Sequence, residues 1–206
     1  MAYQDDIKKA AALLLPWNKL SGCNILVTGA TGLIGGCLVD VLMAHKGRNY
    51  NVYASGRNEE RAGRRFLKYA DDNSFHFVKY DVAHPLEYDV NFQYIIHAAS
   101  GAYPEEFIKH PVEVIKGNIN GVDNLMGYGI QHGIKRLLYI SSGEVYGEGD
   151  GRVFTENYSG YVDCTSLRSC YPSSKRAAET LCISYGAEYG LSLIHISEPT
   201  RPISIS

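Results

Sequence analysis

Short apolar runs alternate with longer amphipathic segments along most of this chain. Each apolar run is four to six residues long and is typical of a buried strand, whereas the longer segments have helical periodicity. The predicted strands are 24–27, 51–55, 75–80, 94–98 and 136–141, and the predicted helices are 33–45, 59–70, 112–132 and 173–188. Repeated strand–helix units predict an α/β fold with a doubly wound parallel sheet, in which ligands bind at the carboxyl ends of the strands.

Two terminal segments flank the predicted domain at residues 22–190. In residues 1–21 the apolar run 10–15 is too short for a signal peptide, and we expect an amphipathic helix that packs on the domain. No segment is long enough to span a membrane. Residues 191–206 fall outside the repeated pattern, although 192–196 fits a sixth strand.

The composition is typical of a soluble globular chain. With 206 residues, of which 45% are hydrophobic and 20% charged, the chain can form one sizeable core. The formal net charge of −2, with Lys and Arg scattered, gives no reason to expect nucleic-acid binding. The five cysteines form no CxxC pair, so neither a disulfide framework nor a metal site is expected. A cytoplasmic location fits these features.

A glycine-rich stretch from Thr28 to Gly36, TGATGLIGG, joins the first predicted strand to the first predicted helix. Gly29, Gly32 and Gly35 allow a tight turn and let a ligand approach the helix N-terminus, where backbone N–H groups attract a pyrophosphate. A glycine turn in this context predicts dinucleotide binding. The GxxGxxG spacing resembles that of the short-chain dehydrogenase/reductase superfamily.

A tyrosine and a lysine lie four residues apart in YPSSK, Tyr171 to Lys175. On a helix they share one face, and the ammonium and a cationic nicotinamide ring both favour a phenolate that can act as a base. Upstream, SSGEVYG places Ser142 at the end of a predicted strand, where its hydroxyl can polarise a substrate hydroxyl. These residues predict proton transfer beside a nicotinamide cofactor.

The glycine turn, SSGEVYG and YPSSK, in this order and at this spacing, resemble the extended short-chain dehydrogenase/reductases that act on nucleotide sugars. These are the NAD-dependent epimerases, dehydratases and decarboxylases. The resemblance covers about residues 22–190 and implies a Rossmann-like fold, an NAD cofactor and a nucleotide-sugar substrate. It also implies catalytic roles for Ser142, Glu144, Tyr171 and Lys175.

The resemblance assigns a set of cofactor-binding residues to the strand ends. The glycine turn would hold the pyrophosphate, the end of the third strand would contact adenine, and small residues after the fourth strand would let the backbone lie against the cofactor. A helix asparagine would support the site. With Arg57, which departs from the family pattern, the full set of candidate cofactor-binding residues is Gly29, Thr31, Gly32, Leu33, Ile34, Gly35, Arg57, Asp81, Val82, Ala98, Ala99, Ser100, Asn118, Tyr171 and Lys175.

The end of the second predicted strand departs from the family pattern. An acid at this position would hold the 2′-hydroxyl of the adenine ribose, but this chain has Ser55-Gly56-Arg57. Arg57 could accommodate a 2′-phosphate, so NADP is an alternative to NAD. The other interpretation is an exposed loop arginine.

Residues 191–206 are a second departure. Family members continue into a strand, an Arg-Pro step and a C-terminal substrate domain, whereas this sequence reads SLIHISEPTRPISIS. That stretch resembles translated sequencing-adapter sequence, so we assign no function to His195, Glu198 or Arg201. We expect the substrate domain to be largely absent and this chain by itself to be inactive.

Two short motifs indicate which reaction the family member performs. Ser142-Gly143-Glu144 places an acid where decarboxylases and 4,6-dehydratases have one, but the dehydratase aspartate is replaced by Gly143. Arg168-Ser169-Cys170-Tyr171 looks like the run before the decarboxylase tyrosine. We therefore favour a UDP-glucuronate decarboxylase. The alternatives are a dTDP-glucose 4,6-dehydratase, a UDP-hexose 4-epimerase, an NADPH-dependent carbonyl reductase and a non-catalytic dinucleotide-binding fragment. Family members often form homodimers through the two long helices of this domain.

Overall fold

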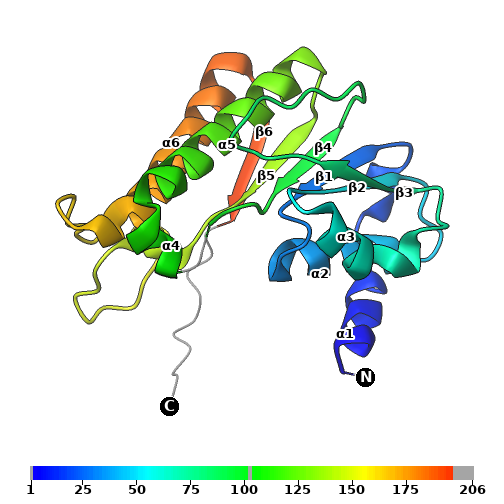
Figure 1. Cartoon of the computed structure of the whole chain (residues 1–206), viewed down its shortest axis with the longest axis horizontal. Coiled ribbons are helices and arrows are strands. Elements are labelled where there is room, and N and C mark those ends of the chain that lie inside the picture. Colours follow the sequence, from blue (N-terminus) through cyan, green and yellow to red (C-terminus); the bar gives the residue numbers. More distant parts are fainter. Residues whose placement is uncertain (1, 102–103, 197–206) are drawn as a thin grey trace.

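Six parallel strands form the sheet on which this chain is built (Figure 1). The computed structural model describes residues 2–101 and 104–196. The strands are β1 Asn24–Thr28, β2 Asn51–Gly56, β3 Phe75–Lys79, β4 Tyr94–His97, β5 Arg136–Ile140 and β6 Ser192–Ile196. They lie in the order β3-β2-β1-β4-β5-β6, and each neighbouring pair is parallel. The predicted doubly wound sheet is confirmed, and its order reverses between β1 and β4.

Helices cover both faces of this sheet (Figure 1). α2 and α3 lie on one face, and the long helices α5 and α6 lie side by side on the other. The helices are α1 Ala2–Ala11, α2 Leu33–Ala44, α3 Glu59–Phe66, α4 Pro104–Lys109, α5 Pro111–Gln131 and α6 Cys170–Tyr189. Short 3-10 turns are η1 Trp17–Leu20, η2 Leu67–Tyr69, η3 Gly143–Tyr146 and η4 Leu167–Ser169. None of the described helices combines the length and the apolar character that crossing a bilayer requires.

Alternate residues of the strands point to the two helical layers. Ile25 and Val27 of β1 belong to the apolar cluster with α2 and α3, whereas Leu26 belongs to the cluster with α5 and α6. All three side chains are almost completely buried. Burial on both faces explains why β1 reads as a continuous apolar run, and each such side chain stabilises the fold by about 1.5–3 kcal/mol.

Three helical segments differ from the sequence expectation. α6 begins at Cys170 rather than at residue 173, because Pro172 fits the first turn of a helix, where its missing N–H would have no intrahelical partner. α3 ends at Phe66 and continues only as the tighter turn η2. α4 was not expected, since six residues are too few to show a helical repeat.

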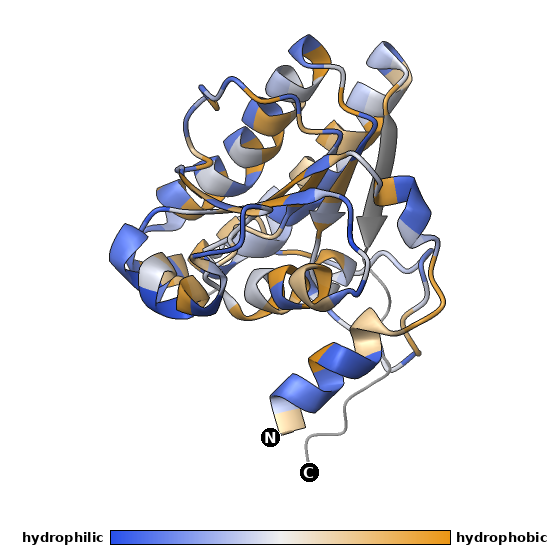
Figure 2. Ribbon diagram, turned by 90° about the vertical axis from the view of Figure 1, so that its right-hand side faces the viewer, coloured by the Kyte–Doolittle hydropathy of each residue, from blue (hydrophilic) through white to orange (hydrophobic). Residues whose placement is uncertain are grey.

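The N-terminal segment forms α1, which extends from the body of the fold and packs on α2 (Figure 2). Its residues are mainly hydrophilic, and Ile7 and Ala11 are its buried members. The three leucines that follow, Leu13 to Leu15, are exposed. The helix therefore docks through a narrow apolar contact, and the boundary between residues 1–21 and the sheet domain stays a prediction.

One buried carboxylate joins α1, α2 and α3. Asp40 on α2 is fully buried and accepts hydrogen bonds from Tyr3 Oη at 2.6 Å, Tyr69 Oη at 2.9 Å and Arg65 Nη2 at 2.5 Å, while Lys68 Nζ lies 2.8 Å away. Burial alone would raise the pKa of Asp40, but these partners lower it to about 2. These bonds link α2, which begins at the glycine turn, to α1 on one side and to α3 and η2 on the other.

Candidate active site

The glycine turn packs against the end of β4. Gly29 has a φ of +64°, and a Cβ there would lie 2.6 Å from the carbonyl oxygen of Ala98 and 2.7 Å from Ala99 Cα. Only glycine can adopt this backbone conformation without strain and also avoid this contact. The structure thus brings together the predicted cofactor residues of the first and fourth strands at the reversal point of the sheet.

The other two glycines of the turn have different surroundings. A Cβ on Gly35 would lie 2.4 Å from the carbonyl oxygen of Gly29, so this glycine lets α2 pack on the turn. Gly32 precedes the first residue of α2, is exposed and would meet only the same oxygen, at 3.2 Å. Leu33 and Ile34 beside it are also exposed. The turn therefore leaves an open backbone face at a helix N-terminus, and these residues fit a pyrophosphate.

The ends of β2 and β3 complete this edge of the sheet. Ala30 N–H donates to the carbonyl of Ser55 at 3.0 Å, and a Cβ on Gly56 would lie 3.5 Å from the side chain of Thr31. Arg57 is exposed directly after Gly56. The second strand therefore ends against the glycine turn.

Asp81 and Val82 follow β3 and have structural partners of their own. Asp81 Oδ1 accepts the N–H of Ala83 at 3.1 Å, as in a turn closed by an aspartate side chain. The carbonyl of Val82 accepts from Asn124 Nδ2 on α5 at 2.9 Å. The roles of both residues toward a cofactor stay a prediction.

A buried histidine ties β1 to β4 beside the turn. His97 Nδ1 lies 2.7 Å from Thr28 Oγ1, and both residues are fully buried. Burial, with a smaller effect from the charge of Lys175, lowers the pKa of His97 to about 3, so its ring is neutral. Only one of the two ring nitrogens is satisfied, since Nε2 has no partner among the described groups.

Asn118 connects the end of β4 to the helix that carries Tyr171. Ser100 Oγ donates to Asn118 Oδ1 at 2.8 Å, and Asn118 Nδ2 donates to Ser174 Oγ at 2.9 Å. Ser174 Oγ in turn donates to the carbonyl of Cys170 at 2.6 Å. Asn118 is buried on α5, so its side chain bridges three elements. Sequence reasoning missed Ser174, because serine in a helix has no distinctive pattern.

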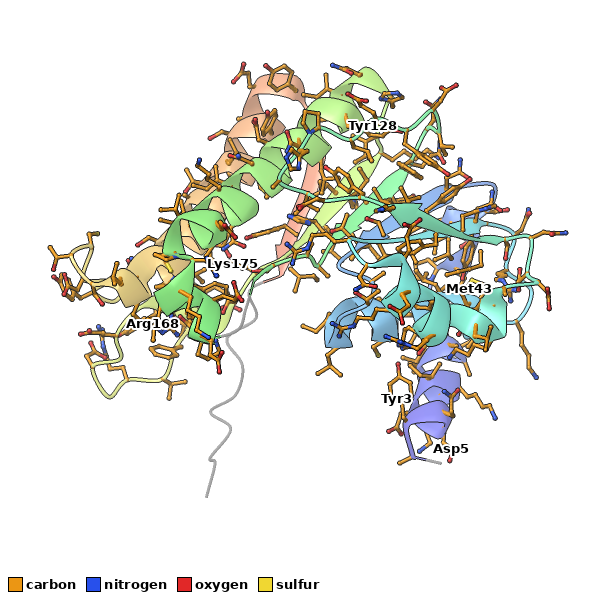
Figure 3. All side chains as sticks on the ribbon, viewed as in Figure 1. Tyr3, Asp5, Met43, Tyr128, Arg168 and Lys175 are labelled. Carbon is orange, nitrogen blue, oxygen red and sulfur yellow. The ribbon has the colours of Figure 1, made fainter. Side chains whose placement is uncertain are left out.

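Lys175 is buried between α6 and the strands (Figure 3). Its Nζ donates to the carbonyl of Ile140 at 3.0 Å and lies 4.6 Å from the ring centroid of Tyr139 and 5.8 Å from that of Tyr171. The side chain is only 2% exposed, and burial lowers the pKa of Lys175 to about 8. The predicted Tyr–Lys pair is thus assembled on one helix face.

We expect the buried ammonium of Lys175 to make stability depend on pH. Its pKa is about 8 in the folded chain and about 10.4 in the unfolded one, so its contribution to stability rises with pH above about 8. In Lys175→Met this contribution is absent. The stability advantage of Lys175→Met over the parent should therefore shrink by about 1–2 kcal/mol between pH 7.5 and 9.5.

Urea unfolding at both pH values measures this difference, in which titrations shared by the two proteins cancel. The matched control is Lys116→Met, which removes an exposed lysine from α5 and should show a constant difference. A constant difference for Lys175→Met as well would contradict the prediction.

Ser142 and Glu144 follow β5 at the same edge. Ser142 Oγ accepts the N–H of Glu144 at 3.2 Å and begins η3. The hydrogen bond from Lys175 on α6 goes to the carbonyl of Ile140, which precedes this serine by two residues in the chain. Glu144 Oε1 accepts from Arg168 Nη2 at 2.6 Å, and both side chains are partly exposed.

Arg168 and Phe107 join Glu144 to Tyr171. The guanidinium carbon of Arg168 lies 4.6 Å from the ring centroid of Phe107 on α4, and that ring stacks on Tyr171 with 4.7 Å between centroids. Tyr171 is only 7% exposed beneath it. Sequence reasoning missed Phe107, because its helix was too short to recognise.

A cleft opens beside this cluster. Its volume is about 340 Å³, within the range of small-molecule sites. Carboxylates and one guanidinium line it, together with Tyr161 and other residues between Gly147 and Pro172. The charged members are Glu144, Glu148, Asp163 and Arg168. The described residues contain no cluster of His, Cys, Asp or Glu side chains suited to a metal ion.

A model of the NAD dependent epimerase/dehydratase family matches residues 25–197. The chain belongs to this family. The predicted resemblance, including its NAD-dependent class of enzymes, is thereby confirmed.

Relatives with curated names include several decarboxylases. UDP-glucuronic acid decarboxylase 6 of Arabidopsis thaliana is 35% identical over 176 residues, which are 84% of this chain and 49% of that protein. UDP-glucuronic acid decarboxylase 1 of Danio rerio is 33% identical over 169 residues, 81% of this chain and 38% of that protein. This chain therefore spans half or less of the length of these relatives.

Solved structures show the same fold. A UDP-N-acetylglucosamine 4-epimerase of Methanobrevibacter ruminantium M1 matches with a TM-score of 0.70 and 23% identity over 85% of this chain and 54% of that one. A dTDP-glucose 4,6-dehydratase of Bacillus anthracis, solved with NAD, matches with a TM-score of 0.68 and 23% identity over 84% and 54% of the two chains. At these identities the likeness concerns architecture.

Proposed function

We propose that this chain is the dinucleotide-binding and catalytic half of an NAD-dependent enzyme that modifies a nucleotide sugar through a 4-keto intermediate. The observation that carries the proposal is the pairing of Tyr171 with the buried Lys175 at the edge where the glycine turn also lies. Neither feature alone would suffice. A tyrosine–lysine pair beside an open pyrophosphate cradle supports oxidation at a sugar hydroxyl.

Three side chains have distinct roles in the proposed chemistry. Tyr171, as the phenolate, takes the proton of the C4 hydroxyl, and the Lys175 ammonium stabilises the phenolate before that transfer. Ser142, just past the strand end that Lys175 contacts, donates a hydrogen bond to the reacting oxygen. Bound NAD⁺ would supply the hydride acceptor. Asn118 acts as a positioning residue for the first turn of α6.

UDP-glucuronate is the substrate that we favour. The named relatives with 33–35% identity are UDP-glucuronic acid decarboxylases, and oxidation at C4 prepares loss of the C6 carboxylate as CO₂. The fold neighbours include a dehydratase and epimerases, which keep those reactions as alternatives. Glu144 is engaged in an ion pair with Arg168, so proton donation to a leaving hydroxyl would require that pair to open.

We expect no substantial turnover by the chain alone. Holding a hexose C4 about 3–3.5 Å from the nicotinamide can lower the barrier by roughly 7–11 kcal/mol, and we assign the nucleotide grip that provides it to the half of the relatives that this chain does not span. The chain is incubated with NAD⁺ and UDP-glucuronate, UDP-glucose or dTDP-glucose, and products are followed by mass spectrometry. Robust product formation would show that the substrate site has been misplaced.

A chimera of this chain with the C-terminal half of the Arabidopsis relative tests whether the proposed catalytic residues support the reaction. It should release CO₂ and a UDP-pentose from UDP-glucuronate, and Tyr171→Phe should reduce the rate by about 10²–10⁴-fold. A 4-keto-6-deoxy or epimeric product from the glucose substrates would instead support the alternatives. No bound nicotinamide after purification, with NADPH consumed on simple carbonyls, would favour the carbonyl reductase.

A further inference from the structure

The end of β2 lacks the acid that would recognise an unphosphorylated adenine ribose. Ser55, Gly56 and Arg57 occupy this end, and the backbone of Ser55 is bonded to Ala30 in the glycine turn. Gly56 lies under Thr31 of the same turn. A ribose attached to a pyrophosphate on the turn therefore reaches the residues that follow β2.

The acids nearest in sequence are already engaged. Glu59 is paired with Lys79 at 2.9 Å, and Glu60 is paired with Arg64 at 2.6 Å. Asp81, at the end of the neighbouring strand, accepts a backbone N–H two residues further on. Each of the three carboxylates therefore already has a partner within the protein.

Arg57, by contrast, is available. It is exposed, and in the described part of the chain it forms no ion pair. Asn58 uses its side chain to cap α3, accepting the N–H of Arg61 at 2.8 Å. Ser55 Oγ is buried at the same strand end without a partner among the described groups. The end of β2 thus offers one uncompensated guanidinium and no free carboxylate.

We propose that Arg57 binds a ribose 2′-phosphate, so that this chain binds NADP(H) at least as tightly as NAD(H). This inference rests on the proposed dinucleotide site. A guanidinium recognises a phosphate monoester through several charge-assisted hydrogen bonds, whereas a 2′-hydroxyl gains little from it. A family member with this strand end would then differ in cofactor choice from a member that carries the acid.

Calorimetry on the full chain tests the proposal at one fixed salt concentration, because charge pairing weakens with salt. The ligands are NADP⁺ and NAD⁺, and adenosine 2′,5′-bisphosphate and adenosine 5′-monophosphate as probes of the adenosine half. Arg57→Ala should weaken both 2′-phosphorylated ligands about 10- to 100-fold and change the other two by less than about twofold. Arg64→Ala, which removes a paired arginine from the same surface, should change none of them.

A second variant tests the reverse direction. A Cβ on Gly56 meets only ordinary contacts, the nearest at 3.5 Å, so Gly56→Asp can restore an acid without displacing backbone. It should shift preference toward NAD⁺ by at least tenfold, because a carboxylate repels the 2′-phosphate and accepts from the 2′-hydroxyl.

The outcomes separate this inference from the proposed function. If NAD⁺ binds tightly and the 2′-phosphate weakens binding, or if Arg57→Ala affects all ligands equally, the 2′-phosphate site is wrong and the dinucleotide site stands. Adenosine 3′,5′-bisphosphate binding as tightly as the 2′,5′ isomer would reduce Arg57 to an unspecific attraction and also overturn the inference. If none of the nucleotides binds, both proposals are wrong.

Discussion

Gly32→Val should leave the chain folded and weaken binding of NAD(H) and NADP(H) by more than about 100-fold, since it loses charge-assisted bonds to the pyrophosphate. Gly32 is exposed at the start of α2, with an ordinary backbone φ of −81°. A valine can therefore adopt this conformation. Its side chain would fill the face through which the pyrophosphate reaches the helix N–H groups.

Two other glycines give the controls for this prediction. Gly35→Ala places a Cβ 2.4 Å from a backbone oxygen, so it should lower the melting temperature as well as the affinity. Gly63→Ala adds a Cβ where nothing lies within 4 Å, on the exposed part of α3, and should stabilise by about 0.5–1 kcal/mol without affecting binding. Calorimetry and thermal unfolding measure both properties. Unchanged affinity in a folded Gly32→Val would remove the turn from the cofactor site.

Asp40→Ala should destabilise the chain by about 3–5 kcal/mol, a large fraction of the stability of an ordinary domain. The substitution leaves Arg65, Lys68, Tyr3 and Tyr69 without the buried carboxylate that they share. Arg64→Ala is the control, because its ion pair with Glu60 is exposed, and its cost should stay below about 1 kcal/mol. Denaturant unfolding at pH 7 measures both.

Asp40 should also make the free energy of unfolding decrease as the pH is lowered. Asp40 has a pKa of about 2 in the folded chain and about 3.9 when unfolded, so its stabilising effect is complete above about pH 4 and is lost as pH falls toward 2. The gap between the parent and Asp40→Ala should therefore narrow over this range. A gap that stays constant from pH 5 to pH 2.5 would show that charge on Asp40 contributes nothing.

The strands and the glycine turn were predictable because burial on both faces and a backbone conformation leave direct marks in sequence. Leu26 and its neighbours are apolar because both layers bury them, and Gly29 is glycine because φ is positive there. The stack of Phe107 on Tyr171 was not predictable, since it depends on a short helix arriving from a distant part of the chain. The same holds for the role of Ser174, which only the partner side chain of Asn118 reveals.

Resemblance supplied what local physics could not. Periodicity alone places Ser142 and Tyr171 near one sheet edge, but their catalytic roles come from the motif, and they stay predictions after the fold is known. Arg168 shows the opposite case. The motif marked it as part of a run, whereas its contacts with Glu144 and Phe107 follow from the folded loop.

The hydrogen bonds from Ser100 through Asn118 to Ser174 restrict how far the end of β4 can move relative to α6. Hydride transfer depends on sub-ångström placement, and residues that hold such groups have to be stiff. Because the hydrogen bonds through Asn118 fasten the end of β4 directly to the first turn of α6, we expect Tyr171 and the glycine turn to keep a constant separation. In the proposed function, the reacting distance would then stay constant whichever sugar is bound.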